Sequence, residues 1–316
     1  MSAVVILGAG AVGSLFGARF AAAGEDVLLV GRPAHVEAIR AHGLTVEGTE
    51  PGTFPVEATA TLPEGTRADA VLLTVKSFDL AAASAELARA VAPTPTALLG
   101  NGLGIEATAA DALRSAGWPK PERSLVRAVH SVPATWLSPG KVRASGTGEV
   151  VFPEPTAAGP ASAATAVLIE LFARSRFEVR ASASFDLEVW RKAVVNAAIN
   201  PVTAVRHVVN GALRDGPARA EAELLLEEAV RVARRDGVEL SLATARADLD
   251  RIVRATAENR SSMLQDVDRG RPTEVGAISE EILRRGRGYG LELPATRRAV
   301  AEVRRTVARA RPPAQR

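Results

Sequence analysis

The chain has 316 residues, of which 47% are hydrophobic and 24% charged, as is ordinary for a soluble globular protein. This length favours two domains over one. The formal net charge of +3 is small and the sequence has no long block of like charges, so nucleic-acid binding is not favoured. The absence of cysteine excludes disulfides, iron–sulfur clusters, thiolate metal sites and cysteine nucleophiles.

Metal binding and membrane association are not expected either. The four histidines, His35, His42, His130 and His207, are scattered without the spacing of metal ligands. No apolar run approaches the roughly 20 residues that cross a bilayer, and no basic segment precedes an apolar one at the start of the chain. We therefore expect no metal site, no membrane partner, no signal peptide and a cytoplasmic location.

The first thirty residues have the pattern of a dinucleotide-binding βαβ unit. Ala3–Leu7 is an apolar run of strand length, Ser14–Ala23 fits a helix, and Val27–Val30 is a second apolar strand. A G-x-G-x-x-G turn joins the first strand to the helix, where glycines permit a tight turn, close approach of amides to a pyrophosphate, and close helix packing. The helix N-terminus adds unsatisfied N–H groups and the positive end of its dipole. The predicted cofactor-binding residues of this turn are Gly8, Ala9, Gly10, Ala11, Val12 and Gly13.

Arg32 follows the second strand, at the place where NAD-dependent enzymes usually carry an acidic residue for the ribose hydroxyls. A carboxylate there would repel a 2′-phosphate, whereas a guanidinium can bind it through paired charge-assisted hydrogen bonds. This predicts NADPH as the cofactor, with Arg32 as the main residue that recognises its 2′-phosphate. The alternative is that Arg32 is an ordinary surface residue.

Several later segments read as further strands of the same sheet. Ala70–Val75 and Thr96–Gly100 are short and apolar, and each is followed by polar residues, Lys76-Ser77 and Asn101-Gly102, at the end where such sheets bind ligands. We expect the remaining strands at Ser124–Val132, Gly140–Ala144, Gly148–Phe152 and Phe177–Arg180.

From about Phe185 the pattern changes to long segments of 3.6-residue period. We expect helices at Phe185–Ile199, Ala218–Asp236, Ser241–Glu258, Thr273–Tyr289 and Pro294–Arg311. The fold class is therefore α/β: an N-terminal Rossmann-type doubly wound sheet plus a C-terminal all-α domain. The expected domains are a nucleotide-binding domain over 1–182 and a helical substrate and catalytic domain over 183–316. Apolar stripes on the helices are compatible with a homodimer as well as with a monomer.

Lys192, Asn196 and Asn200 stand at i, i+4 and i+8, which places them on one stripe of the first of these helices. Their neighbours are apolar, and buried polar groups cost free energy unless they find partners or a ligand. Only four of the 39 basic residues are lysines, so Lys192 is either kept because lysine can titrate or is a chance survivor of the arginine bias, and composition leaves both open. The alternative is a hydrogen-bond network between packed helices. Pro201 is expected to end or kink this helix.

A second polar cluster spans Asn259–Asp266 and continues to Thr273-Glu274, directly before an apolar-periodic helix. Glu274 can act there as a helix N-terminal acid that favours the dipole, or as an active-site acid. The pattern alone does not choose between these two roles.

Taken together, these motifs resemble the ketopantoate reductases (2-dehydropantoate 2-reductases) over nearly the whole chain. The matching pieces are GAGAVG at 8–13, VKS at 75–77, NGLG at 101–104, KAVVNAAINPVTA at 192–204 and NRSSMLQDVDRGRPTE at 259–274. The resemblance implies NADPH-dependent reduction of a small 2-oxo acid, 2-dehydropantoate, to (R)-pantoate, on the route to pantothenate and coenzyme A.

The resemblance also implies roles for single residues. It makes Lys192 the general acid and Glu274 an active-site glutamate. Lys76 and Asn101 fall on cofactor-side positions. The positions that would bind substrate are Asn196, Asn200, Asn259 and Ser262. The chemistry agrees, because a positively charged donor can stabilise the oxyanion formed by hydride addition and then protonate it.

The sequence departs from the family in two places. Gly276 stands where the family typically has an aspartate, and the segment 130–137 matches poorly. These departures leave a reductase expected but keep open one of the same fold that acts on another 2-oxo acid or ketone. A non-catalytic NADPH-binding sensor is the alternative of another class, and the retained acid and substrate residues argue against it. An imine reductase or β-hydroxyacid dehydrogenase is disfavoured by the serine-rich motif at 259–266.

Overall fold

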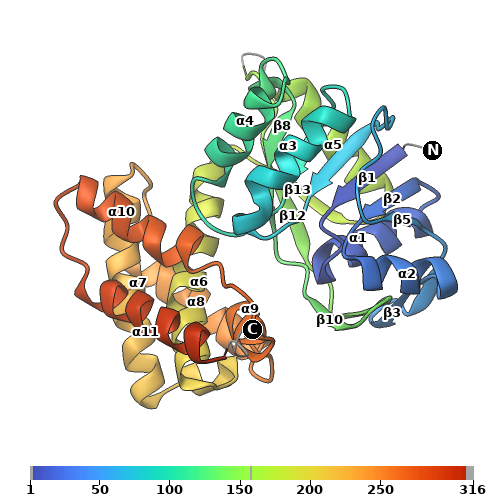
Figure 1. Ribbon diagram of the computed structural model, residues 1–316. Coiled ribbons are helices and arrows are strands. Elements are labelled where there is room, and N and C mark those ends of the chain that lie inside the picture. Colours follow the sequence, from blue (N-terminus) through green and yellow to red (C-terminus); the bar gives the residue numbers. More distant parts are fainter. Residues whose placement is uncertain (1–2, 157–158, 311–316) are drawn as a thin grey trace, which may run out of the picture. The chain divides into compact units, whose positions relative to one another are not determined.

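The computed structural model describes residues 3–156 and 159–310. The contacts of the chain divide it into two compact units (Figure 1). The first consists of Met1–Gly100 and Ile105–Phe185, and the second of Asn101–Gly104 and Asp186–Arg316. The short segment Asn101–Gly104 thus belongs with the second unit although both of its flanks belong to the first.

The first unit is built on a six-stranded parallel sheet in the order β5-β2-β1-β6-β7-β8. Its central strands form because they are apolar on both faces, as parallel strands covered by helices must be. This order, with two runs of strands on either side of β1, is that of a Rossmann sheet and confirms the predicted fold class. The strands are β1 (Ala3–Leu7), β2 (Asp26–Val30), β5 (Glu57–Thr59), β6 (Ala70–Leu73), β7 (Thr96–Leu98) and β8 (Leu125–Arg127).

Helices cover the two faces of this sheet. On one face α1 and α5 meet through Phe16, Phe20 and Phe172, whose rings lie 5.1–5.9 Å apart edge to face. On the other face α3 packs against α4, and α3 also contacts β6 (Figure 1). The helices of this unit are α1 (Ala11–Ala22), α2 (Pro33–His42), α3 (Leu80–Ala90), α4 (Ile105–Ser115) and α5 (Ser162–Arg174), with short 3₁₀ turns η1 (Ser77–Asp79) and η2 (Pro121–Arg123).

The prediction that the later strands complete the same sheet was wrong, because only β8 joins it. Ala128 separates β8 from β9, and β9 pairs instead with β12 in a three-stranded sheet of order β13-β12-β9. A four-stranded sheet has the order β10-β11-β3-β4. The strands are β3 (Leu44–Gly48), β4 (Gly52–Phe54), β9 (Val129–His130), β10 (Ala134–Ser138), β11 (Lys141–Ala144), β12 (Glu149–Pro153) and β13 (Glu178–Ser182).

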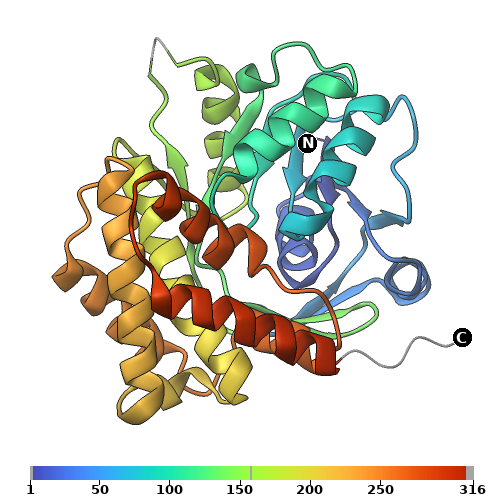
Figure 2. The ribbon, with the colours of Figure 1, turned by 60° about the vertical axis from the view of Figure 1, so that its left-hand side comes forward.

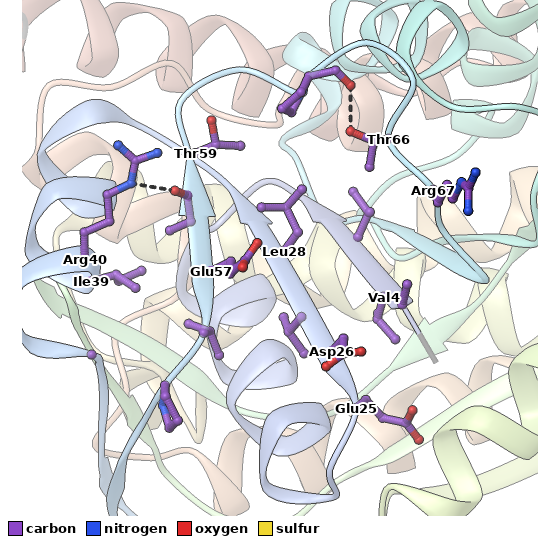
Figure 3. Close-up of a pocket in the computed structure, with 18 residues that line it drawn as sticks. Val4, Glu25, Asp26, Leu28, Ile39, Arg40, Glu57, Thr59, Thr66 and Arg67 are labelled. Atoms are coloured by element: carbon purple, nitrogen blue, oxygen red, sulfur yellow. Dashed lines mark hydrogen bonds between the residues drawn. The ribbon is translucent and has the colours of Figure 1, made fainter. Parts of the chain in front are cut away.

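The connection from β5 to β6 crosses the sheet without a helix, through residues 60–69. A crossover between parallel strands is usually helical and covers the sheet face. Because this crossover has no helix, one face of the sheet stays uncovered over β1, β2 and β5. A cavity of about 1130 Å³ lies there. Figure 3 shows Asp26, Leu28 and Glu57 among its lining side chains, with the Arg40 guanidinium bonded to the Ala58 carbonyl at the sheet edge.

The described part of the second unit is all-helical apart from its loops and turns. Figure 2 shows α11 packed beside other helices of this unit, and its contacts include α7 and α9. In the described residues, no helix has the length and apolar character needed to cross a bilayer. The elements are α6 (Phe185–Arg206), η3 (Asn210–Leu213), α7 (Gly216–Arg235), α8 (Leu242–Ala255), α9 (Ser262–Asp268), the π-helical turn η4 (Gly276–Glu280), α10 (Glu281–Gly288) and α11 (Pro294–Ala310).

Two details differ from the sequence-based expectation for these helices. Pro201 does not end α6, which continues to Arg206. The segment expected as one helix over Thr273–Tyr289 begins only at Gly276, and with a π turn. Pro201 is buried inside the helix near its C-terminal end, and tertiary packing there outweighs the loss of one backbone hydrogen bond.

Candidate active site

The glycine turn after β1 is held against the end of β2. The amides of Gly8 and Ala9 donate to the Val30 carbonyl at 3.0 and 2.9 Å. Gly8 has φ +108°, and a Cβ there would lie 2.6 Å from the Val75 nitrogen. A Cβ on Gly10, by contrast, would meet nothing nearer than the Gly8 carbonyl oxygen at 3.8 Å. Gly8 is therefore required by packing, whereas the space at Gly10 is open and would be filled by a side chain.

This open space faces the start of α1, which has no side-chain cap and no acidic residue in its first turn. Uncapped N–H groups at the positive end of a helix dipole form an anion site. The turn from Gly8 to Gly13 therefore fits a dinucleotide pyrophosphate, with the amides of Ala11, Val12 and Gly13 in position to hold it.

Thr74, which sequence reasoning did not single out, fastens this turn to β6. Its hydroxyl donates to the Gly8 carbonyl at 2.9 Å and lies 3.2 Å from the Leu7 carbonyl. A Cβ on Gly13 would be 2.5 Å from the Thr74 Oγ1 atom, so glycine at 13 makes room for this contact. The one available signal was a hydroxyl residue inside an otherwise apolar strand, two residues before Lys76.

Arg32 and Lys76 lie beside the same turn. Arg32 is exposed and is the N-cap residue of α2, which begins at Pro33. Its predecessor Gly31 packs on Ala9, since a Cβ on Gly31 would be 2.7 Å from the Ala9 Cβ. Lys76 is half-buried and precedes η1, one residue after Val75, whose nitrogen contacts Gly8. The first unit therefore brings together all the predicted cofactor residues except Asn101.

The second unit carries the predicted substrate and catalytic residues. Lys192 and Asn196 are half-buried on α6, and Asn200 is 5% exposed one turn further on. In the described part of the chain, neither the Asn196 nor the Asn200 side-chain amide has a hydrogen-bond partner. A helix-packing network was the alternative for this stripe, and residues 3–156 and 159–310 supply no such network for these two amides.

The start of α9 is tied to α6 close to Asn200. Thr203 Oγ1 donates to Ser261 Oγ at 2.7 Å, and Ser261 caps α9 by accepting from the Leu264 amide at 3.1 Å. Ser262, the next residue, has an exposed side chain. Asn259 is also exposed, and its carbonyl accepts from the Asn210 amide at 2.9 Å. Capping is thus the task of Ser261, which leaves Ser262 for another role.

Glu274 lies in the turn before η4 and is 5% exposed. Its carboxylate accepts a hydrogen bond of 3.2 Å from the side-chain amide of Asn101. An ionised carboxylate is only an acceptor, so the Asn101 nitrogen must face it and Oδ1 must point elsewhere. Asn101 was expected on the cofactor side, and the structure places it in the second unit, hydrogen-bonded to the predicted catalytic residue Glu274.

An ion pair joins α6 to α8. Arg191 binds Asp248 of α8 through two hydrogen bonds of 2.7 Å, and Arg251 adds a third of 3.0 Å. Burial raises the pKa of Asp248, but the hydrogen bonds and charges of Arg191 and Arg251 outweigh it, so the pKa lies below its usual range. Asp248 therefore stays ionised and fixes the helix turn that carries Lys192.

Another polar contact lies within the first unit. His35 is 1% exposed, accepts the Gly140 amide at Nδ1 at 2.8 Å, and therefore donates from Nε2 to Ser14 Oγ at 2.9 Å. Burial lowers its pKa from 6.5 to about 4. His35 is thus a neutral side chain that links Ser14 of α1 to Gly140, which directly precedes β11, by two hydrogen bonds.

The large cavity on the open sheet face contains none of the predicted site residues. The two groups of predicted site residues are therefore the glycine turn of the first unit and the polar stripe with Glu274 in the second.

The glycine turn and the strand order define a Rossmann-type dinucleotide-binding protein with an additional all-helical unit. Residues 4–156 match the family model described as Ketopantoate reductase PanE/ApbA, and residues 184–306 match that of its C-terminal part. The chain belongs to this family of oxidoreductases.

Relatives match over nearly their whole length. A protein of Archaeoglobus fulgidus named 2-dehydropantoate 2-reductase is 34% identical over 95% of this chain and 96% of its own. One of the same name from Pyrococcus abyssi is 32% identical over 92% and 93%. A crystal structure of a PanE/ApbA family ketopantoate reductase from Ralstonia eutropha has a TM-score of 0.83 and 34% identity, covering 98% and 99% of the two chains. A D-mandelate dehydrogenase with NADH and anilino(oxo)acetate shares the fold at a TM-score of 0.88 and 23% identity, covering 98% and 99%.

Proposed function

We propose that this protein catalyses the NADPH-dependent reduction of 2-dehydropantoate to (R)-pantoate, a step toward pantothenate and coenzyme A. The observation that carries the proposal is the stripe on α6: a half-buried lysine in line with two asparagines whose side-chain amides have no partner among the described residues. The names of relatives that match the whole chain supply the substrate.

Lys192 is the general acid in this proposal. When hydride adds to the keto carbon, negative charge forms on the keto oxygen, and the Lys192 ammonium stabilises that charge and then gives up a proton to it. Asn196, Asn200 and Ser262 donate hydrogen bonds to the substrate carboxylate and hydroxyl without adding another titrating group. Asn259 extends this set, and Glu274 is the active-site acid that orients Lys192.

NADPH, when bound, supplies the hydride. The amides of the turn from Gly8 to Gly13 hold the pyrophosphate, and Arg32 holds the 2′-phosphate. Lys76 and Asn101 are assigned to the nicotinamide side. We assign nucleotide binding to residues 1–182 and the substrate and catalytic groups to 183–316, in a cytoplasmic enzyme that can form homodimers.

The direct test follows NADPH oxidation at 340 nm by the purified protein, with and without 2-dehydropantoate. Turnover that depends on the substrate, with NADPH strongly preferred to NADH, is the expected result. NADPH binding without turnover of any 2-oxo acid would instead make the protein a sensor and overturn the proposal.

A reductase acting on another 2-oxo acid is the second candidate, and Gly276 favours it. A Cβ at this position would meet nothing nearer than Glu280 Oε2 at 3.9 Å, so the space that the family's aspartate would use is open two residues from Glu274. A panel of 2-oxo acids of increasing size, assayed with the wild-type protein and with Gly276→Asp, separates the candidates. A bulkier substrate preferred by the wild type and lost in the variant would support this alternative.

A further inference from the structure

The segment Asn101–Gly104 is built into the second unit by three kinds of contact. The Leu103 side chain is 5% exposed and lies in the apolar core of that unit. The Leu103 amide donates to the Ala277 carbonyl at 2.8 Å. The Asn101 side chain donates to Glu274. A main-chain bond, a buried side chain and a charged hydrogen bond together fix these four residues, which begin three positions after the last residue of β7 in the other unit.

Gly102 is what allows this approach. Its φ is +101°, and a Cβ on it would lie 2.5 Å from the Ala277 carbonyl oxygen and 2.6 Å from the Ala277 Cβ. These obstacles are backbone and a short side chain, so they cannot rotate away. An alanine at position 102 would push the segment Asn101–Gly104 away from Ala277 in η4.

The partner of Gly102 lies on the π turn. In η4 the Glu280 amide bonds the Val275 carbonyl and the Glu281 amide bonds the Gly276 carbonyl, five residues back in each case. Such turns are rare in proteins and are frequent at functional sites. Here the turn begins two residues after Glu274 and carries the Ala277 carbonyl that accepts the Leu103 amide, so it joins the segment Asn101–Gly104 to the acid.

We propose that Gly102 is a positioning residue of the reductase, acting through Asn101. Its close approach to Ala277 keeps the Asn101 amide on Glu274, so the orientation of that amide, with Oδ1 turned toward a ligand donor, is set by the second unit and not by the strand before it. The proposal rests on the proposed function for its kinetic consequence, but the joint itself can be tested without turnover.

The experiment compares Gly102→Ala with Gly237→Ala. Gly237 belongs to the same unit and has a similar φ of +85°, but a Cβ there would meet nothing within 4 Å. Both variants strain the backbone, and only the first has the clash. We expect Gly102→Ala to lower kcat by at least about tenfold while the Kd for NADPH changes by less than about threefold, and Gly237→Ala to leave both unchanged.

A double variant tests whether the effect runs through Asn101. If it does, Asn101→Ala/Gly102→Ala loses no more kcat than Asn101→Ala alone, because the second change has nothing left to misplace. If the kcat losses of the two single variants instead multiply in the double variant, Gly102 acts independently of Asn101, and the proposal is overturned. A Gly102→Ala variant with wild-type kcat would also overturn it.

Hydrogen exchange measures the joint independently of activity. In the wild-type protein we expect the Leu103 amide to be protected, and in Gly102→Ala to exchange at least about tenfold faster, with the helices of the second unit unchanged. An unprotected Leu103 amide in the wild type overturns the proposal even if Gly102→Ala does not fold. A protected amide in a protein that reduces no 2-oxo acid would leave the joint intact and refute only the proposed function.

Discussion

The Asn101 amide and the Glu274 carboxylate are hydrogen-bonded at 3.2 Å although they lie 173 positions apart in the chain. The bond lies inside the second unit, which also carries Lys192. A side-chain amide is thus a hydrogen-bond partner of a buried carboxylate, and buried polar groups of this kind need such partners.

Replacing Lys192 tests the assigned acid. We expect Lys192→Ala to lower kcat by about 10²- to 10⁴-fold, because both charge stabilisation and proton delivery are lost. Lys192→Arg keeps the charge but not the readily lost proton, and should also be strongly impaired. Steady-state kinetics with NADPH binding measured separately provide the check. Lys141→Ala, which removes an exposed lysine of β11, is the control; near-normal kcat in Lys192→Ala would refute the role.

Arg32→Glu tests the cofactor assignment. Losing charge-assisted hydrogen bonds to a 2′-phosphate, and adding repulsion, should weaken NADPH binding by about 10- to 100-fold and NADH binding far less. Fluorescence titration with both nucleotides measures this preference. Arg67→Glu makes the same charge change at another exposed arginine of the first unit. An unchanged ratio of the two Kd values would mean that Arg32 is an ordinary surface residue.

The buried His35 makes stability depend on pH. Its pKa is about 4 when folded and near 6.5 when unfolded, so as pH falls below 6.5 the unfolded state takes up a proton that the folded state does not. Stability is therefore full above pH 6.5 and is lost down to pH 4. Between pH 7.5 and 5 we expect His35 to account for a loss of about 2 kcal/mol. Urea unfolding of the wild type and of His35→Gln at both pH values isolates this loss. If both proteins lose the same unfolding free energy between pH 7.5 and 5, the prediction is contradicted.

Glu228 is a buried carboxylate whose removal should destabilise the second unit. It accepts the Ala295 and Thr296 amides at 2.9 and 2.7 Å and the Thr296 hydroxyl at 2.6 Å, and so caps α11 from α7. Glu228→Ala leaves these donors buried without an acceptor, and should cost about 2–4 kcal/mol of unfolding free energy. The neighbouring Glu227→Ala breaks only an exposed pair with Arg246 and should cost less than about 1 kcal/mol. Equal losses in thermal or urea unfolding would contradict this account.

Local signals made the first βαβ unit predictable. The run Ala3–Leu7 and the glycines at 8, 10 and 13 each carry their meaning within a few residues, and β1 has the expected bounds. Sheet membership, in contrast, depends on which distant strand offers a free edge. Val129–His130 continues the apolar run of β8, and nothing local indicates that it pairs with Val150–Val151.

The same contrast holds for the candidate site. The spacing of Lys192, Asn196 and Asn200 predicts a common stripe because one helix carries all three. Local pattern leaves Glu274 equally suited to capping and catalysis, and it gives no sign of the hydrogen bond to Asn101, 173 positions away in the chain. Thr74 and His35 were missed because each acts through a contact with a segment remote in sequence.

The built-in segment Asn101–Gly104 has a consequence for dissecting the protein. Cutting the chain near residue 185 would give a helical fragment that lacks Leu103, with a vacant site in its core and an Ala277 carbonyl deprived of its donor. The complementary fragment would carry the same leucine exposed. No single cut of this polypeptide therefore yields both units whole, and an autonomous helical half would need the four residues grafted back onto it.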